Sequence, residues 1–154
     1  CAAGRKALAN HQALLCDVEM VKQGITKRMI QNPPLCYLNH EQTAIMAKQH
    51  GETRSMAALN LWGDQLEASV VVIGNAPTAL FRLLEMLKAG AAKPALIVGI
   101  PVGFVGAAES KHALWNLHQE LGIECITLLG RQGGSAAAAS VVNALLRCNM
   151  GERY

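Results

Sequence analysis

The sequence has little of what several common protein classes depend on. Aromatic residues make up 4% of the chain and charged residues 16%, and the formal net charge is only +3. Nucleic-acid-binding proteins combine clustered basic side chains with aromatic rings for base stacking, so this composition argues against nucleic acid as a partner. No apolar run approaches the roughly 20 residues of a membrane span, and we therefore expect no membrane association.

The cysteines lack the spacing of a metal or redox site. Their number is odd, they are widely separated, and no C-x-x-C motif occurs. The pattern supports neither zinc nor thiol exchange, and we predict no metal and no cofactor. We expect the cysteines to be small buried hydrophobic residues of a cytoplasmic protein, since the cytoplasm keeps thiols reduced. They are Cys1, Cys16, Cys36, Cys125 and Cys148.

What the sequence does contain is three strand-like runs, each followed by a glycine-rich turn and a helix-like segment. The runs cover residues 70–73, 95–98 and 123–129. Uninterrupted apolar runs of this length are typical of strands buried on both faces of a parallel sheet. The sequence therefore predicts an α/β fold: a three-layer sandwich with a mostly parallel sheet and helices on both faces. Residues 1–154 are expected to form a single domain.

Shorter elements are expected upstream of these runs. Residues 13–16 and 35–38 each have the character of a short strand. Asp17 and Asn39 are candidate N-caps of two helices, because each carries a side-chain oxygen just before a helix-like segment, and Thr53 opens a third helix.

The loop at residues 130–135 is the first candidate site. Loops that leave the carboxyl ends of parallel strands form the ligand crevice of such folds, so we expect all three glycine-rich loops at one edge of the sheet. Glycine lets the backbone approach a ligand, the helix start supplies free N–H groups, and the Arg131 guanidinium suits a carboxylate or phosphate. This favours an anion site that includes Gly134 and Ser135. The alternative is a tight turn with Ser135 as a simple N-cap.

The other two loops are less specific. In residues 74–78, either Asn75 or Thr78 can cap the next helix or contact a ligand. The glycines of residues 99–106 do not match G-x-G-x-x-G, and no Gly-Lys-Ser/Thr occurs, so nucleotide binding is poorly supported. Phe104 is the only aromatic residue in the three loops. It either stacks on a flat ligand or fills the core.

Two further basic residues stand at expected helix starts. Arg54 is an anion-binding candidate for this reason. Lys111 follows Glu109, which complements the helix dipole, and either reaches the crevice or lies on a solvated helix start. The histidines have no catalytic or metal-binding setting. His112 and His118, for example, are six residues apart and do not share a helix face.

Five segments, taken in order, resemble those of the precorrin-8X methylmutases, the precorrin isomerases of cobalamin biosynthesis. They are residues 17–21 (DVEMV), 53–55 (TRS), 74–81 (GNAPTALF), 101–111 (PVGFVGAAESK) and 130–135 (GRQGGS). The resemblance spans essentially the whole chain, and residues 101–111 are its most specific part.

The resemblance implies a homodimeric isomerase that moves a methyl group between adjacent corrin-ring carbons. The product would be hydrogenobyrinate, or cobyrinate when the ring already holds cobalt. The corrinoid substrate is rimmed with carboxylates, which suits glycine turns, helix N-termini and arginines around an apolar wall. The substrate-binding residues expected on this basis are Arg54, Ser55, Asn75, Thr78, Pro101, Gly103, Phe104, Ser110, Lys111, Arg131, Gly134 and Ser135.

The resemblance also implies a catalytic histidine that residues 1–154 do not match. Residues 28–31 read Arg-Met-Ile-Gln where the family has Arg-Met-Ile/Val-His, but they follow residues 17–21, which is the wrong order, and Gln31 cannot donate a proton as an acid. We therefore expect the chain to be the C-terminal part of a precorrin isomerase, with the general acid upstream of Cys1. The alternative is a non-catalytic tetrapyrrole-binding protein with the same crevice.

Overall fold

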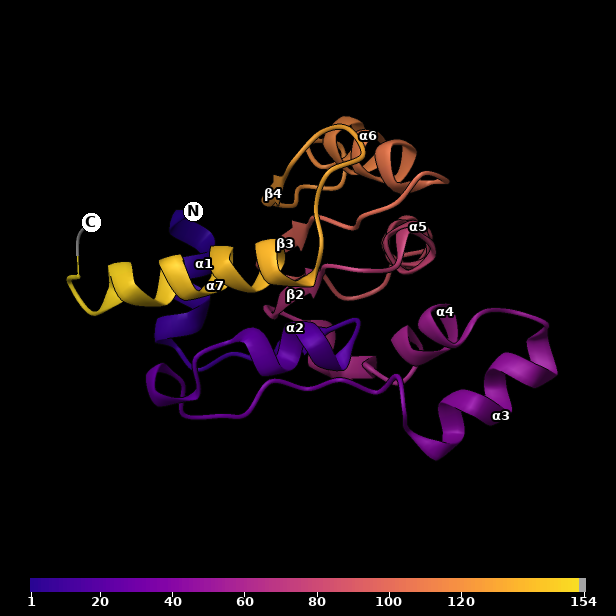
Figure 1. Cartoon of the computed structure of the whole chain (residues 1–154), viewed down its shortest axis with the longest axis horizontal. Coiled ribbons are helices and arrows are strands. Elements are labelled where there is room, and N and C mark those ends of the chain that lie inside the picture. The colour runs from indigo at the N-terminus through magenta and orange to yellow at the C-terminus, as the bar shows by residue number, and fades with distance from the viewer. Residues whose placement is uncertain (153–154) are drawn as a thin grey trace.

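A four-stranded parallel sheet forms the centre of the computed structural model, which describes residues 1–152 (Figure 1). Its spatial order is β1-β2-β3-β4, and each neighbouring pair is parallel. The α/β fold and the parallel sheet are therefore confirmed. The strands are β1 (Leu14–Cys16), β2 (Val70–Ile73), β3 (Leu96–Gly99) and β4 (Cys125–Thr127).

Helices cover both faces of the sheet, as predicted. One face packs against α1 (Ala2–Ala9), α2 (Glu19–Gly24) and α7 (Ser135–Asn149). The other face packs against α4 (Arg54–Leu59), α5 (Pro77–Lys88) and α6 (Ala107–Leu117). Helix α3 (Glu41–His50) packs on α4 and lies away from the sheet (Figure 1). Short 3-10 helices occur at Lys27–Met29 and Gly63–Leu66.

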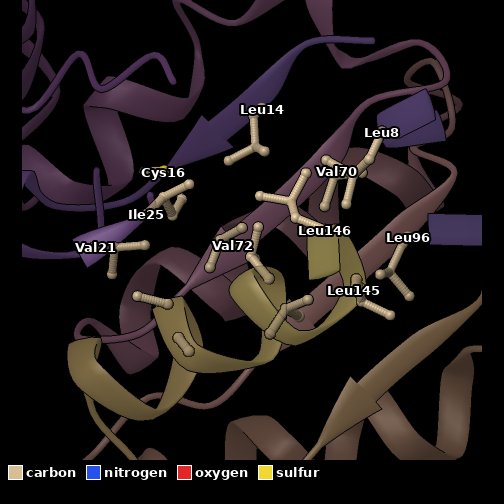
Figure 2. Packing of buried hydrophobic residues seen from close by; sticks show 14 of the residues in the cluster. Leu8, Leu14, Cys16, Val21, Ile25, Val70, Val72, Leu96, Leu145 and Leu146 are labelled. Carbon is tan, nitrogen blue, oxygen red and sulfur yellow. The ribbon is translucent and has the colours of Figure 1, made fainter. Parts of the chain in front are cut away.

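The core is divided by the side-chain alternation of the central strands. Val70 and Val72 of β2 point toward α7, whereas Val71 and Ile73 point toward α5. Figure 2 shows the first of these two layers, with Leu146 of α7 among its labelled residues. All four side chains of β2 are fully buried, which explains the uninterrupted apolar run.

The predicted strand at residues 35–38 is wrong. Only a single parallel bridge forms, between Leu15 and Leu35. The chain then turns, with the His40 amide donating to the Tyr37 carbonyl. Strand β1 ends at Cys16, one residue after the bridge, so the residues that follow Leu35 have no strand left to pair with.

Neither predicted N-cap is confirmed, whereas Thr53, which opens α4, does cap its helix: its hydroxyl accepts from the Met56 amide at 3.2 Å. Helix α3 is capped by the His40 ring, which accepts from the Gln42 amide, and not by Asn39. Helix α2 has no side-chain cap, because the Asp17 carboxylate points elsewhere. Asn39 and Asp17 do not cap these helices because their side-chain oxygens accept hydrogen bonds from groups distant in the sequence. Asn39 accepts from Arg54, and Asp17 accepts from the turn that follows β2.

Asp17 ties the end of β1 to the turn that follows β2. Its carboxylate accepts hydrogen bonds from the amides of Gly74 at 3.0 Å and of Asn75 and Ala76 at 2.9 Å each. The side chain is buried, with 1% of the residue exposed. Burial raises the pKa of the carboxyl, and the three N–H donors act in the opposite direction by stabilising the charged form.

The cysteines differ from the expectation that they are buried. Only Cys16 is fully buried, Cys36 and Cys125 are half-buried, and Cys1 and Cys148 are exposed. The exposed pair lies at or near the ends of α1 and α7, where a helix leaves the core. Burial raises the pKa of the Cys36 and Cys125 thiols, which disfavours the reactive thiolate.

Among the helices of residues 1–152, none combines the length and the apolar character needed to cross a bilayer.

Replacing Asp17 by alanine is expected to lower the free energy of unfolding by about 3–5 kcal/mol. The substitution leaves three amides without their acceptor, and a buried unsatisfied donor costs about 1–3 kcal/mol. Urea unfolding followed by circular dichroism measures the change. Asp64→Ala, at an exposed aspartate, is the control and should change stability by less than about 0.5 kcal/mol. A loss of under about 1 kcal/mol for Asp17→Ala would contradict the role assigned to this carboxylate.

Candidate active site

The loops that follow β2, β3 and β4 meet at the carboxyl edge of the sheet, as the sequence predicts. The Gly134 amide donates to the Ile100 carbonyl at 2.9 Å, and the Gly103 amide approaches the Arg131 carbonyl at 3.5 Å. Both contacts join the loop after β3 to the loop after β4. The loop after β2 lies beside them, because Gly74 packs directly against the start of α7 at Ser135.

Two glycines allow this close approach. A Cβ atom at Gly133 would lie 2.4 Å from the carbonyl oxygen of Ile100 and 2.7 Å from that of Pro101. A Cβ atom at Gly74 would lie 2.9 Å from the Cα of Ser135. Both contacts are shorter than non-bonded atoms tolerate, so a side chain at either position would push the loops apart.

The N-terminus of α7 is open. Its N-cap is Gly134, with φ of 126°, and Ser135 provides no side-chain cap. Within residues 1–152, the amides of residues 135–137 have no acceptor, and the exposed Arg131 side chain makes no hydrogen bond or ion pair. Free helix amides and a free guanidinium are groups that bind an anion. The simple-cap alternative for Ser135 is therefore not supported.

The loop after β3 exposes apolar side chains. Phe104 is 85% exposed and Val105 is 91% exposed, while Pro101 is buried. Phe104 therefore does not fill the core, and its ring is free to contact a flat ligand. Gly103, with φ of 146°, adopts a conformation that a residue with a side chain rarely takes.

Asn75 and Thr78 are exposed at the start of α5. The Thr78 hydroxyl lies 3.4 Å from that of Thr53, which places the start of α4 beside the start of α5. Arg54 follows Thr53, but its guanidinium already donates to the Leu38 carbonyl at 2.9 Å and to Asn39 Oδ1 at 2.8 Å. Ser55, next in the chain, is partly exposed.

Two predicted substrate-binding residues lie beneath the surface. Ser110 and Lys111 have no exposed area. The Ser110 hydroxyl donates to the Ala107 carbonyl at 3.0 Å, and Lys111 Nζ donates to the Gln132 carbonyl at 2.6 Å. Burial lowers the pKa of the Lys111 ammonium. Both side chains therefore bond to backbone carbonyls beneath the surface of the loops.

The histidine side chains make local contacts. His40 caps α3, His50 faces Glu52 at 4.0 Å, and the His118 ring lies 2.6 Å from the Trp115 carbonyl. In the described part of the chain, none of these histidine contacts reaches the glycine loops, and no cluster of three His, Cys, Asp or Glu side chains could hold a metal.

A hollow of about 260 Å³ lies at the opposite, amino edge of the sheet and is unrelated to these loops. It is bounded by α1 and by residues that precede β2 and β3, including Lys6, Ala68 and Ala95. The carboxyl-edge site is instead an open surface between loops.

Sequence reasoning missed two residues that shape this edge. Asp17 is predicted only as a helix cap, although its position directly after β1 is a signal for the carboxyl edge. Thr127, the last residue of β4, donates through its hydroxyl to the Gly99 carbonyl at 2.7 Å and so links the ends of β3 and β4.

Comparison with known proteins identifies a family over nearly the whole chain. The family model described as Precorrin-8X methylmutase matches residues 1–148. A precorrin-8X methylmutase of Pseudomonas aeruginosa is 56% identical over 146 residues, covering 94% of this chain and 69% of that protein. A cobalt-precorrin-8 methylmutase of Methanocaldococcus jannaschii is 38% identical over 143 residues, covering 93% of this chain and 64% of that protein. The chain thus spans about two thirds of the length of these relatives.

A solved structure shows the same fold. The precorrin-8X methylmutase of Thermus thermophilus superposes with a TM-score of 0.84 at 32% identity, covering 97% of this chain and 73% of that one. The sequence segments, the parallel sheet with its three converging loops and these matches agree: this chain belongs to the precorrin-8X methylmutase family.

Proposed function

We propose that this chain supplies the corrinoid-binding part of an isomerase that moves a methyl group between adjacent ring carbons. The observation that carries the proposal is the arrangement of the carboxyl edge. The open N-terminus of α7 and the free Arg131 guanidinium lie on the loop that contacts the apolar loop of Phe104. A corrinoid combines a large apolar ring with peripheral carboxylates. The carboxyl edge of the sheet offers contacts to both.

Each part of the edge has a distinct role in this proposal. Arg131 and the first amides of α7 bind a rim carboxylate, since both are free. Phe104, with the exposed part of the loop after β3, contacts the ring. Asn75 and Thr78 are exposed at the start of α5 and supply hydrogen bonds to other rim groups. Together they fix the ring in one orientation, which methyl migration between neighbouring carbons requires.

Relatives of this chain are named for both the cobalt-free and the cobalt-containing substrate. The proposed polar contacts are to the rim of the macrocycle. The rim is the same in both substrates, so these contacts serve either one. The family match favours the isomerase over the non-catalytic tetrapyrrole-binding protein and over a nucleotide-binding domain. We also propose a cytoplasmic location, since the cysteines of the described chain are free thiols.

Arg131→Ala is expected to weaken hydrogenobyrinate binding by about 1.5–3 kcal/mol, the usual cost of a lost charged hydrogen bond. Arg54→Ala should cost less, because its guanidinium is already engaged by Leu38 and Asn39. Absorbance titration at low salt measures both. Arg28→Ala, at another exposed arginine, is the matched control and should leave the affinity unchanged. An unaltered dissociation constant for Arg131→Ala would refute the anion site.

Residues 1–154 alone are expected to bind the macrocycle but to isomerise precorrin-8X only slowly. Migration assisted by ring protonation needs a positioned acid with a pKa near the working pH, and no histidine contact of the described chain reaches the loops. Absence of such an acid typically lowers the rate by about 10²–10⁴-fold. Single-turnover absorbance traces should compare this chain with one carrying the additional segment of the longer relatives. Equal rates would show that residues 1–154 supply the proton.

We propose that the protein is a homodimer. Hydrophobic residues make up 51% of the sequence. Besides the loop of Phe104, several large apolar side chains remain exposed, including Leu128 and Leu129 at 47% each and Trp115 at 51%. Leu128 and Leu129 directly follow β4, the edge strand of the sheet, where a second subunit can cover them.

Sedimentation equilibrium at micromolar concentration should therefore give about twice the chain mass of 16.4 kDa. Leu129→Lys places a charge among the exposed apolar residues and should shift the equilibrium toward the monomer, whereas Lys88→Glu on α5 should not. A single species of chain mass for the unaltered protein would contradict the dimer.

A further inference from the structure

Lys111 is an unusual lysine because it is completely buried. It lies in the first half of α6, and none of its surface is exposed. Lysine side chains normally extend their ammonium group to water, even when the aliphatic part is covered. Among the described residues, the only other charged side chain buried to this degree is Asp17. A buried lysine therefore calls for a partner that explains it.

The partner is a backbone carbonyl of the site. Lys111 Nζ donates to the Gln132 carbonyl at 2.6 Å, across 21 positions in the sequence. No carboxylate of the described chain forms an ion pair with this ammonium. One carbonyl uses one of the three N–H donors of an ammonium group, so the positive charge is incompletely compensated.

Gln132 lies at the centre of the anion-binding loop. Arg131 precedes it, and Gly133 follows it and packs against the Ile100 and Pro101 carbonyls. Gly134 then donates to the Ile100 carbonyl and caps α7. The loop is therefore held on one side by the loop after β3 and on the other by Lys111. Both contacts act on the backbone, which leaves the Arg131 side chain and the α7 amides free.

A purely structural contact would not need a lysine. A neutral donor or water satisfies a carbonyl without the cost of burying a charge. A positive charge beneath the loop has a further effect, since it adds to the potential of Arg131 and of the α7 N-terminus. An anion bound on the loop would offset part of the cost of the buried ammonium.

We propose that Lys111 is a positioning residue for carboxylate recognition: through the Gln132 carbonyl it fixes the loop that presents Arg131 and the α7 amides, and its charge favours an anion there. The proposal rests on the proposed function in one respect: it takes the bound carboxylate to be one from the rim of the corrinoid. The support of the loop itself is independent of which anion binds.

Lys111→Met tests this, because methionine fills a similar volume without a donor or a charge. Hydrogenobyrinate affinity, measured by absorbance titration, is expected to fall about 10–100-fold. Lys88→Met, at an exposed lysine of α5, is the control and should leave the affinity within twofold. If Lys111→Met does not fold, Lys111→Gln, which removes the charge but keeps an N–H donor, takes its place with an expected loss of at least fivefold.

A double-mutant cycle with Arg131→Ala distinguishes positioning from general destabilisation. If Lys111 acts through the loop, the loss caused by Lys111→Met should be at least threefold smaller once Arg131 is already alanine, and the remaining loss reflects the α7 amides and the lysine charge. An equal loss in both backgrounds, or no loss in either, would overturn the proposal.

Hydrogen exchange without ligand separates this proposal from the proposed function. Lys111→Met should lower protection of the Gly134 amide at least tenfold and leave the amides of β2 unchanged. Unchanged protection at Gly134 would refute the support of the loop. If Lys111→Met lowers the protection of the Gly134 amide but the unaltered protein does not bind hydrogenobyrinate, the proposed function fails and the positioning role of Lys111 stands.

Discussion

The hydrogen bonds from the turn after β2 to the Asp17 carboxylate are the constraint on which the carboxyl edge depends. Three backbone amides converge on this one buried side chain, 57 to 59 residues away in the sequence. They fix where β2 ends and where α5 begins. Gly74, which lies in this turn, packs on the start of α7. The position of the start of α7 therefore depends on a carboxylate that follows the neighbouring strand β1.

The edge is completed by contacts between successive loops. The Ile100 amide donates to the Ile73 carbonyl, Gly134 donates to the Ile100 carbonyl, and Lys111 donates to the Gln132 carbonyl. All of these bonds are to backbone atoms. Buried residues thus determine the course of the loops, whereas the exposed residues Arg131 and Phe104 remain available to a ligand. Ser110 and Lys111, at the end of the most specific segment, belong to the buried group.

The sequence was sufficient for those features that depend on local pattern. The uninterrupted apolar run at residues 70–73 predicts β2 because both faces of that strand are covered. The glycine-rich turn at residues 130–135 predicts close contact between loops, and Gly133 makes it, since a Cβ there would clash with the Ile100 and Pro101 carbonyls. Local pattern failed at residues 35–38, where apolar character was present but the neighbouring strand β1 ends at Cys16 and leaves only one bridge. It also failed for the exposed cysteines at the ends of α1 and α7.

Asp17 and Lys111 show what local pattern cannot provide. Asp17 precedes a helix and therefore predicts a cap, and Lys111 lies in a helix and therefore predicts a solvated or ligand-facing side chain. Each instead binds the backbone of a distant loop, and neither partner is identifiable from the residues nearby. Their charges also match their partners: the carboxylate accepts from amides leading into α5, and the ammonium donates to a carbonyl leading into α7. Because Asp17 already occupies the amides before α5, the free amides of α7 are the better place for an external carboxylate.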